Sequence, residues 1–145
     1  MPHAQRSVTI ARPVDAVFAY LTDGEKCPQW RSSVLDIARV AGDGGIRTRY
    51  RQGVRGPMGR RIAADYEITA HEPDRVIEFQ AIAGPARPHG RYELAPDDGG
   101  TRLTFTLDAE LTGLKRLLMG SAVQSTMDLE VKALDQVKFV MEATA

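Results

Sequence analysis

The sequence predicts an α+β fold in which a curved, seven-stranded antiparallel sheet wraps around one long C-terminal helix, with two short helices after the first strand. Three observations lead to this prediction. Apolar residues recur at helical spacing after a short first strand, alternate with polar residues from about residue 33 to residue 110, and return to helical spacing from about residue 113. No internal repeat or linker divides the chain, so we expect residues 1–145 to form a single domain.

The first strand is expected at residues 7–11, and Pro13 follows it. Proline suits the first turn of a helix, because its missing N–H is not needed there. Apolar residues at helical spacing then predict an amphipathic helix at 13–22. A second helical turn, which carries Cys27, is expected to stop near Trp30.

Six further strands are expected, each with one apolar face and each separated from the next by a turn rich in glycine, proline or aspartate. They cover residues 34–40, 46–54, 60–71, 76–83, 90–94 and 102–109. Consecutive strands joined by short turns form an antiparallel meander. In strand 46–54 the inward face is expected to carry Ile46, Thr48, Tyr50, Gln52 and Val54.

The last segment is expected to be one helix of roughly thirty residues, which at ~1.5 Å per residue is about 45 Å long and should cross the sheet diagonally. Its apolar stripe consists of Leu114, Leu117, Leu118, Met127, Val131, Leu134, Val137 and Met141. Four polar residues interrupt this stripe near its middle: Ser121, Gln124, Ser125 and Asp128. We interpret the interruption as the polar side of a cavity.

Composition argues against several classes of partner. Nineteen basic and nineteen acidic side chains cancel, so the basic surplus that attracts nucleic acids or anionic membranes is absent. No apolar run approaches the ~18–20 residues that membrane insertion requires. A single cysteine rules out an internal disulfide, which favours a cytoplasmic location. The sequence leaves the oligomeric state open and is compatible with a homodimer.

Several segments resemble the START/Bet v 1-like superfamily, and in particular its bacterial polyketide cyclase/dehydrase-type branch. They are VTIARPVDAVFAYLTD at 8–23, the Pro-x-Trp of residues 28–30, GRYEL at 90–94 and GGTRLTF at 99–105. The resemblance covers essentially the whole chain. It implies a helix-grip fold with an apolar cavity between the sheet and the last helix, but it does not name a reaction, because such folds host many functions.

The inward faces offer mainly hydrocarbon with a few polar groups, which is the usual make-up of a small-molecule pocket. The ligand-binding candidates are Tyr50, Gln52, Tyr66, Phe79, Tyr92, Phe105, Gln124, Met127 and Asp128. The alternative for each tyrosine is an ordinary core aromatic with its hydroxyl at the rim. Trp30 is expected to close one end of the sheet or to border the entrance.

No recognisable catalytic constellation is present. Asp128 is a candidate general base if it is buried, and His89 with Arg91 are candidates if they reach the cavity mouth. The alternatives are a solvated helix acid that pairs with Lys132 and a solvated loop histidine. Cys27 has no activating neighbour in the sequence, so an inert thiol is expected. The three histidines lack metal-ligand spacing, so we expect no metal and no cofactor.

An arginine stripe occupies the outer face of strand 46–54 and consists of Arg47, Arg49, Arg51 and Arg55. Acidic residues on later strands, such as Glu67 and Glu78, are expected to neutralise it by cross-strand pairing. The leading hypothesis is therefore a binding protein for a small, mainly apolar molecule. The alternatives are a polyketide cyclase or dehydratase that acts on a similar substrate and a protein-interaction domain that has no motif of its own.

Overall fold

The computed structural model describes residues 2–84, 86–111 and 113–143. Its first half contains β1 (His3–Ile10), α1 (Val14–Thr22), the 3₁₀ turn η1 (Gly24–Gln29), β2 (Val34–Ala41), β3 (Arg49–Arg55), the 3₁₀ turn η2 (Pro57–Gly59) and β4 (Arg61–Ala63). Its second half contains β5 (Tyr66–Glu72), β6 (Val76–Ala81), β7 (His89–Asp97), β8 (Gly100–Asp108), α2 (Gly113–Lys132) and α3 (Leu134–Ala143).

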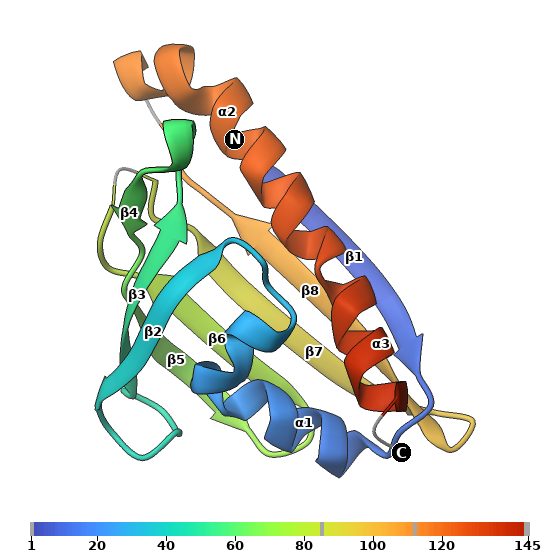
Figure 1. Ribbon diagram of the computed structural model, residues 1–145. Coiled ribbons are helices and arrows are strands. Elements are labelled where there is room, and N and C mark those ends of the chain that lie inside the picture. The colour runs from blue at the N-terminus through green and yellow to red at the C-terminus, as the bar shows by residue number, and fades with distance from the viewer. Residues whose placement is uncertain (1, 85, 112, 144–145) are drawn as a thin grey trace.

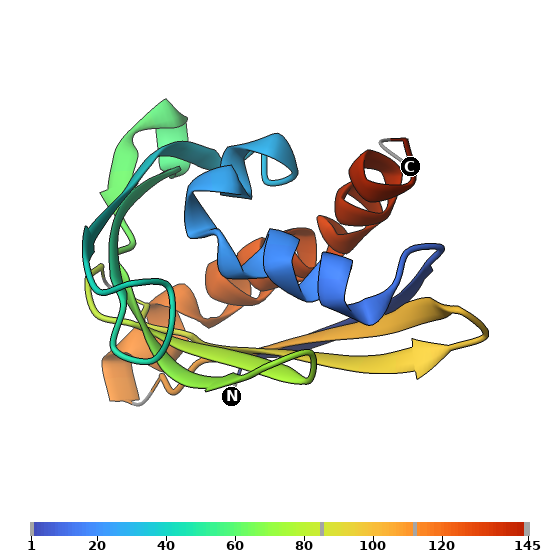
Figure 2. The same cartoon turned by 90° about the horizontal axis from the view of Figure 1, so that it is seen from below.

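The strands form one antiparallel sheet in the order β1-β8-β7-β6-β5-β3-β2, and β4 pairs with β3 beside this path. The chain thus runs as a meander from β2 to β8, and β1 closes the far edge next to β8. The sheet curves, and α1, η1, α2 and α3 all lie on its concave side (Figures 1 and 2). The predicted helix-grip architecture is confirmed.

The described part of the chain holds eight strands, because the predicted strand 60–71 divides into β4 and β5. β4 pairs with the end of β3, and β5 pairs with its beginning. Ala64 and Asp65 lie between them, where the Asp65 carboxylate accepts a hydrogen bond from the backbone N–H of Gln52 at 3.2 Å. A side chain therefore replaces a backbone acceptor at this point, and the strand is interrupted although the pairing with β3 keeps the same register on both sides.

The inward placement predicted for Ile46 is wrong. Ile46 precedes β3 and is 60% exposed, because the chain does not enter the strand until Arg49. Arg47 has a positive φ of 69°, which extended strands do not adopt. The remaining predicted inward residues of this strand are buried or half-buried.

The predicted long helix is broken near Ala133 into α2 and α3. The backbone N–H of Ala133 donates to the carbonyl of Glu130 at 3.1 Å, a 3₁₀ contact that tightens the last turn of α2. From Leu134 onward the new helix seats Leu134, Val137 and Met141 in the core. The break lets one face stay directed at the curved sheet over the length of both helices (Figure 1).

The first turns of α2 also correct the predicted apolar stripe. Leu114, Leu117 and Leu118 are 69%, 83% and 73% exposed. These turns project beyond the strands that the rest of the helix covers (Figure 1), so the sheet offers them no surface to pack against. The stripe is buried from Met127 onward.

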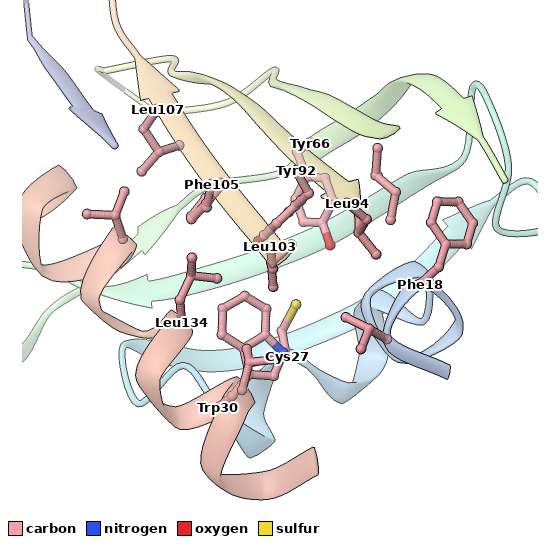
Figure 3. Packing of buried hydrophobic residues seen from close by; sticks show 14 of the residues in the cluster. Phe18, Cys27, Trp30, Tyr66, Tyr92, Leu94, Leu103, Phe105, Leu107 and Leu134 are labelled. Carbon is pink, nitrogen blue, oxygen red and sulfur yellow. The ribbon is translucent and has the colours of Figure 1, made fainter. Parts of the chain in front are cut away.

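The core lies between the concave face of the sheet and the helices (Figure 3). Its most completely buried apolar side chains come from the first strand, α1, β8 and α3: Ile10, Val17, Leu103, Leu134 and Val137. No described helix has both the length and the apolar character that a membrane-crossing segment needs.

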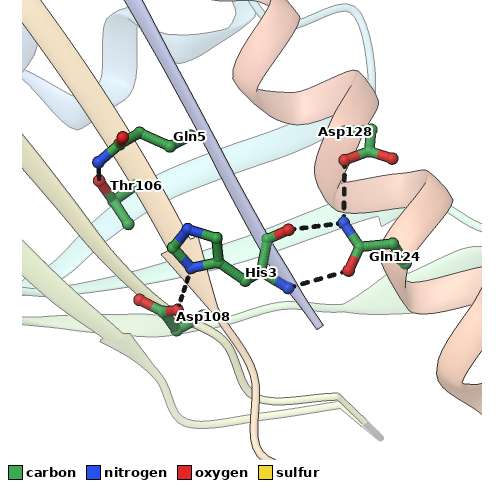
Figure 4. Close-up of polar contacts among 6 residues, drawn as sticks. All are labelled: His3, Gln5, Thr106, Asp108, Gln124 and Asp128. Atoms are coloured by element: carbon green, nitrogen blue, oxygen red, sulfur yellow. Dashed lines mark hydrogen bonds and ion pairs between the residues drawn. The ribbon is translucent and has the colours of Figure 1, made fainter. Parts of the chain in front are cut away.

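Gln124 fastens α2 to the open edge of β1 (Figure 4). Its side-chain oxygen accepts from the backbone N–H of His3 at 2.9 Å, and its side-chain nitrogen donates to the His3 carbonyl at 2.6 Å. The amide thus satisfies the backbone of an edge strand that has no further strand beside it. Near the C-terminal end of β1, on the same edge, the Lys138 ammonium donates a hydrogen bond to the carbonyl of Thr9 at 2.6 Å.

Candidate ligand cavity

A cavity of about 430 Å³ lies between the concave face of the sheet and α2. Its walls come from the end of α1, from η1, from strands β3 to β8 and from α2. This volume falls within the range of ~300–1,000 Å³ that small-molecule sites occupy. The core beneath α3 closes one end of the space, because the large residues buried there leave no room.

Five strands supply a row of aromatic rings that forms the floor of the cavity. Tyr50 and Tyr66 stack at 5.0 Å between ring centroids, and Tyr92 and Phe105 stack at 4.2 Å with only 7° between their planes. Each pair consists of direct cross-strand partners, which explains why the rings meet. Phe79 joins the two pairs, at 5.3 Å from Tyr66 and 6.2 Å from Tyr92.

Gly90 makes room for this row. It is the cross-strand partner of Phe79, and a Cβ at Gly90 would lie only 2.2 Å from two atoms of the Phe79 ring. The ring therefore bends over the backbone of β7 instead of standing up into the cavity. A glycine at this position increases the space available to a ligand.

One part of the wall is polar, and we call it the polar corner: Cys27, Arg31, Gln52, Tyr92 and Glu130. Arg31 Nε donates to Glu130 Oε2 at 2.7 Å, and its Nη1 donates to Gln52 Oε1 at 3.1 Å. The side chains of Arg31 and Glu130 are only 14% and 15% exposed. Burial acts to lower the pKa of Arg31, but the neighbouring groups, Glu130 foremost among them, together outweigh burial and raise this pKa above its ordinary value.

The acceptors of the polar corner are already engaged. Ser33 Oγ donates to Glu130 Oε1 at 2.5 Å, and the other carboxylate oxygen receives Arg31. The Gln52 amide accepts from Arg31 and donates to the carbonyl of Ala64 at 3.1 Å. Each acceptor oxygen of the corner therefore already receives a protein donor.

The hydroxyls and the thiol of the cavity wall remain protonated. Burial raises the pKa of Cys27, Tyr66 and Tyr92, and the nearby positive charge of Arg31 lowers each of these pKa values by less than burial raises it. Arg31 and Tyr66 lie near the Cys27 thiol and act to lower its pKa, but burial is the larger effect. Its raised pKa agrees with the predicted inert thiol.

Tyr50 and Tyr92 of the cavity wall differ in the hydrogen bonds that their hydroxyls make. The Tyr50 hydroxyl donates to the Thr22 carbonyl and accepts from the Gly24 N–H, both at 3.4 Å. The Tyr92 hydroxyl has no hydrogen-bond partner among the described residues, although the residue is only 7% exposed. Tyr92 thus brings an unused donor to the cavity.

Seven of the nine ligand-binding candidates line the cavity: Tyr50, Gln52, Tyr66, Phe79, Tyr92, Phe105 and Met127. The inward placement of Gln124 and Asp128 is wrong. Gln124 turns to the β1 edge, and Asp128 is exposed and accepts from Gln124 at 2.9 Å (Figure 4). The helix presents this side to β1 because the polar edge of that strand offers hydrogen bonds that the cavity does not.

The other two catalytic candidates also lie away from the cavity. His89 pairs with Glu78 at 3.0 Å, and Arg91 pairs with Glu78 at 2.8 Å and with Glu93 at 2.6 Å. These side chains occupy the opposite face of the sheet, because they alternate along β7 with Gly90 and Tyr92, which face the cavity. On the same outer face Arg49 pairs with Glu67 at 2.7 Å, as the sequence predicted.

Sequence reasoning missed Arg31 and Glu130. Glu130 lies three residues after Met127 and four before Leu134, so a charge stands on the buried face of α2. A charged residue on the apolar face of the helix was the sequence signal that could have identified Glu130 as part of the site. Trp30 is buried and borders the cavity beside Arg31, as expected for a residue that closes its end.

Residues 1–138 match the family described as polyketide cyclase/dehydrase and lipid transport. The chain belongs to this family. No relative is found among curated proteins. Within the described residues, no group of three or more histidine, cysteine or acidic side chains is arranged to hold a metal ion.

Solved structures share the fold of this polyketide cyclase/dehydrase-family chain. A protein of Thermus thermophilus is similar with a TM-score of 0.82 and 24% identity, over 99% of both chains. A START superfamily protein of Mycobacterium smegmatis has a TM-score of 0.80 and 18% identity, over 99% of both chains. The Zhui aromatase/cyclase of a Streptomyces species has a TM-score of 0.73 and 18% identity, over 97% of this chain and 93% of that one.

Proposed function

We propose that this protein binds a small, mainly apolar molecule in the cavity between its sheet and its C-terminal helix. The observation that carries the proposal is an aromatic-walled space of about 430 Å³ with its polar groups gathered at one corner. Polyketides, lipids, isoprenoids and quinones have surfaces of this kind. Burial of their hydrocarbon contributes ~25 cal/mol per Å², so 100 Å² of buried ligand surface contributes about 2.5 kcal/mol.

The cavity reaches the protein surface beside the exposed first turns of α2. Leu118 borders the cavity although it is mostly exposed, and Met119 beside it is half-buried. Arg55 on the end of β3 is likewise an exposed residue of the wall. A ligand can therefore enter between α2 and the β3–β4 hairpin without unfolding of the core.

Native mass spectrometry of the purified protein, compared with the denatured chain, tests the proposal directly. A retained small molecule would reveal the chemical class of the ligand by its mass. Protein freed of bound molecules is then titrated with N-phenyl-1-naphthylamine, a neutral probe that fluoresces in apolar surroundings. We expect saturable binding of one probe per chain. The proposal fails if nothing is retained and the fluorescence rises only linearly with probe concentration.

The alternative is an enzyme of the cyclase or dehydratase type, acting on a polyketide-like substrate in the same cavity. It is favoured by the family description and by a fold shared with an aromatase/cyclase. Tyr66, Tyr92 and Glu130 are the groups of the wall that would move protons, since the sequence-predicted catalytic candidates lie outside it. Turnover of a linear polyketide that stops in Glu130→Gln but persists in Asp128→Asn would support the enzyme.

A further inference from the structure

We propose that the polar corner receives a neutral carbonyl oxygen on a flat ring, so that the cavity selects ring ketones over carboxylic acids. The inference rests on the proposed ligand-binding function and names the polar end of the ligand. It follows from an imbalance between the hydrogen-bond donors and acceptors that face this part of the cavity.

The donors exceed the acceptors. Tyr92 is 7% exposed, borders the cavity and has no hydrogen-bond partner among the described residues. Arg31 has five N–H groups. One bonds Glu130 and one bonds Gln52, and the other three have no hydrogen-bond acceptor in the described part of the chain.

The available acceptors are already in use, because both Glu130 oxygens and the Gln52 oxygen receive protein donors. A ligand hydroxyl or amine would add a further N–H or O–H to a corner in which unpaired donors already predominate, and a buried polar hydrogen without an acceptor is costly. A carbonyl oxygen only accepts. It can receive the Tyr92 hydroxyl and an Arg31 N–H together.

The charge balance argues against a carboxylate. Glu130 lies 2.7 Å from Arg31, so the cationic charge of the corner is already neutralised. An acid would add an uncompensated negative charge next to Glu130 in surroundings that exclude water. A neutral ketone adds none, so fatty-acid-like ligands are disfavoured at this end of the cavity.

The aromatic floor beside the corner favours a flat ring. The Tyr92 ring, which carries the unused hydroxyl, stacks on Phe105 at 4.2 Å, and Trp30 meets its edge at 6.3 Å and 80°. Stacked and edge-to-face contacts of this kind extend readily to a planar ligand. A ring that lies along this row directs an attached carbonyl toward the Tyr92 hydroxyl.

Three naphthalene probes that differ in one group provide the test. They are 6-propanoyl-2-dimethylaminonaphthalene, its 6-propyl counterpart and 6-dimethylamino-2-naphthoic acid. Binding is measured by fluorescence for the wild type, Tyr92→Phe and the matched control Tyr50→Phe. The control also removes a hydroxyl from the cavity wall, but that hydroxyl is already bonded to Thr22 and Gly24. The emission of the ketone moves to shorter wavelength when its carbonyl loses a hydrogen bond.

We expect the ketone to bind the wild type most tightly and the acid most weakly. Tyr92→Phe should weaken the ketone roughly three- to tenfold, the usual effect of one lost hydrogen bond, and should shift its emission to shorter wavelength. The propyl probe should be unaffected, and Tyr50→Phe should leave the ketone-to-propyl ratio unchanged. Thermal unfolding checks that each variant is folded.

The inference is overturned if the acid binds as tightly as the ketone, or if Tyr92→Phe weakens the ketone and propyl probes by the same factor without an emission shift. In that case the cavity would still bind apolar ligands, but the polar corner would not be a carbonyl site. If none of the probes binds the wild type in a saturable manner, the proposed function fails as well.

Discussion

Replacement of Glu130 by leucine should leave the guanidinium of Arg31 buried without its counter-charge. The two side chains are 14% and 15% exposed and join α2 to the segment between η1 and β2, far away in the sequence. The substitution removes the 2.7 Å ion pair and also the 2.5 Å hydrogen bond from Ser33. Leucine has nearly the same volume, so the lost polar contacts dominate the effect.

The magnitude follows from the burial of the pair. Removal of one partner of a buried ion pair costs ~3–5 kcal/mol, because the remaining charge is poorly solvated. Residual exposure and the adjoining cavity place this pair at the lower end, so we expect a loss of about 3 kcal/mol in the free energy of unfolding. The double variant Arg31→Met/Glu130→Leu leaves no charge behind and should recover most of the loss.

Equilibrium urea unfolding of the wild type, both variants and a surface control measures these differences. The control is Asp135→Asn, which breaks the ion pair with Arg6 at 2.7 Å, where the partners are 39% and 56% exposed. Exposed pairs contribute little, so its effect should be far smaller. The reasoning is refuted if Glu130→Leu costs no more than the control, or if the double variant is less stable than the single one.

Two further predictions concern the aromatic floor and the titration of its hydroxyl. Gly90→Ala should push the Phe79 ring into the cavity, lower the affinity for N-phenyl-1-naphthylamine and cost about 1–3 kcal/mol of stability through overpacking. The control is Gly120→Ala, whose Cβ would meet nothing within 4 Å and which should leave the affinity unchanged. Equal affinities of the two variants would contradict the packing of Phe79 against Gly90. Burial raises the pKa of Tyr92 above its ordinary 10.0, so above pH 10 the folded chain keeps a proton that the unfolded chain loses. The contribution of Tyr92 to the free energy of unfolding is therefore complete below pH 10 and is lost as the pH rises further. Urea midpoints between pH 8 and pH 11 should therefore fall less steeply in Tyr92→Phe, and parallel curves would exclude this account.

The strands were predictable from the sequence because one side of each faces a continuous core, which forces period-two alternation over most of the sheet. The alternation fails where local interactions override it. Ile46 lies before the strand, and Asp65 replaces a backbone acceptor, so that one predicted strand divides into two. Neither event changes the apolar pattern, so periodicity alone does not reveal it.

The candidate site was predictable only for residues on the sheet. The strand register fixes which residues face inward, and Tyr66, Tyr92 and Phe105 followed from it. The helix is different, because its rotation about its axis depends on what its two flanks contact. Gln124 is held by the edge of β1, which turns Asp128 to solvent and Glu130 to the cavity. Sequence spacing alone does not identify that edge as the stronger partner.

The stability and binding experiments together address why a buried ion pair stands in the wall of an apolar cavity. A well-packed apolar replacement for such a pair is often neutral or stabilising, so stability alone is a poor reason for its presence. If Arg31→Met/Glu130→Leu unfolds like the wild type but binds the naphthyl ketone and its propyl counterpart equally, the pair serves recognition. If the double variant is unstable and keeps the preference for the ketone, Tyr92 alone carries the recognition and the pair serves to join the segment between η1 and β2 to α2. The two readings predict opposite combinations of urea midpoint and ketone-to-propyl ratio in a single variant.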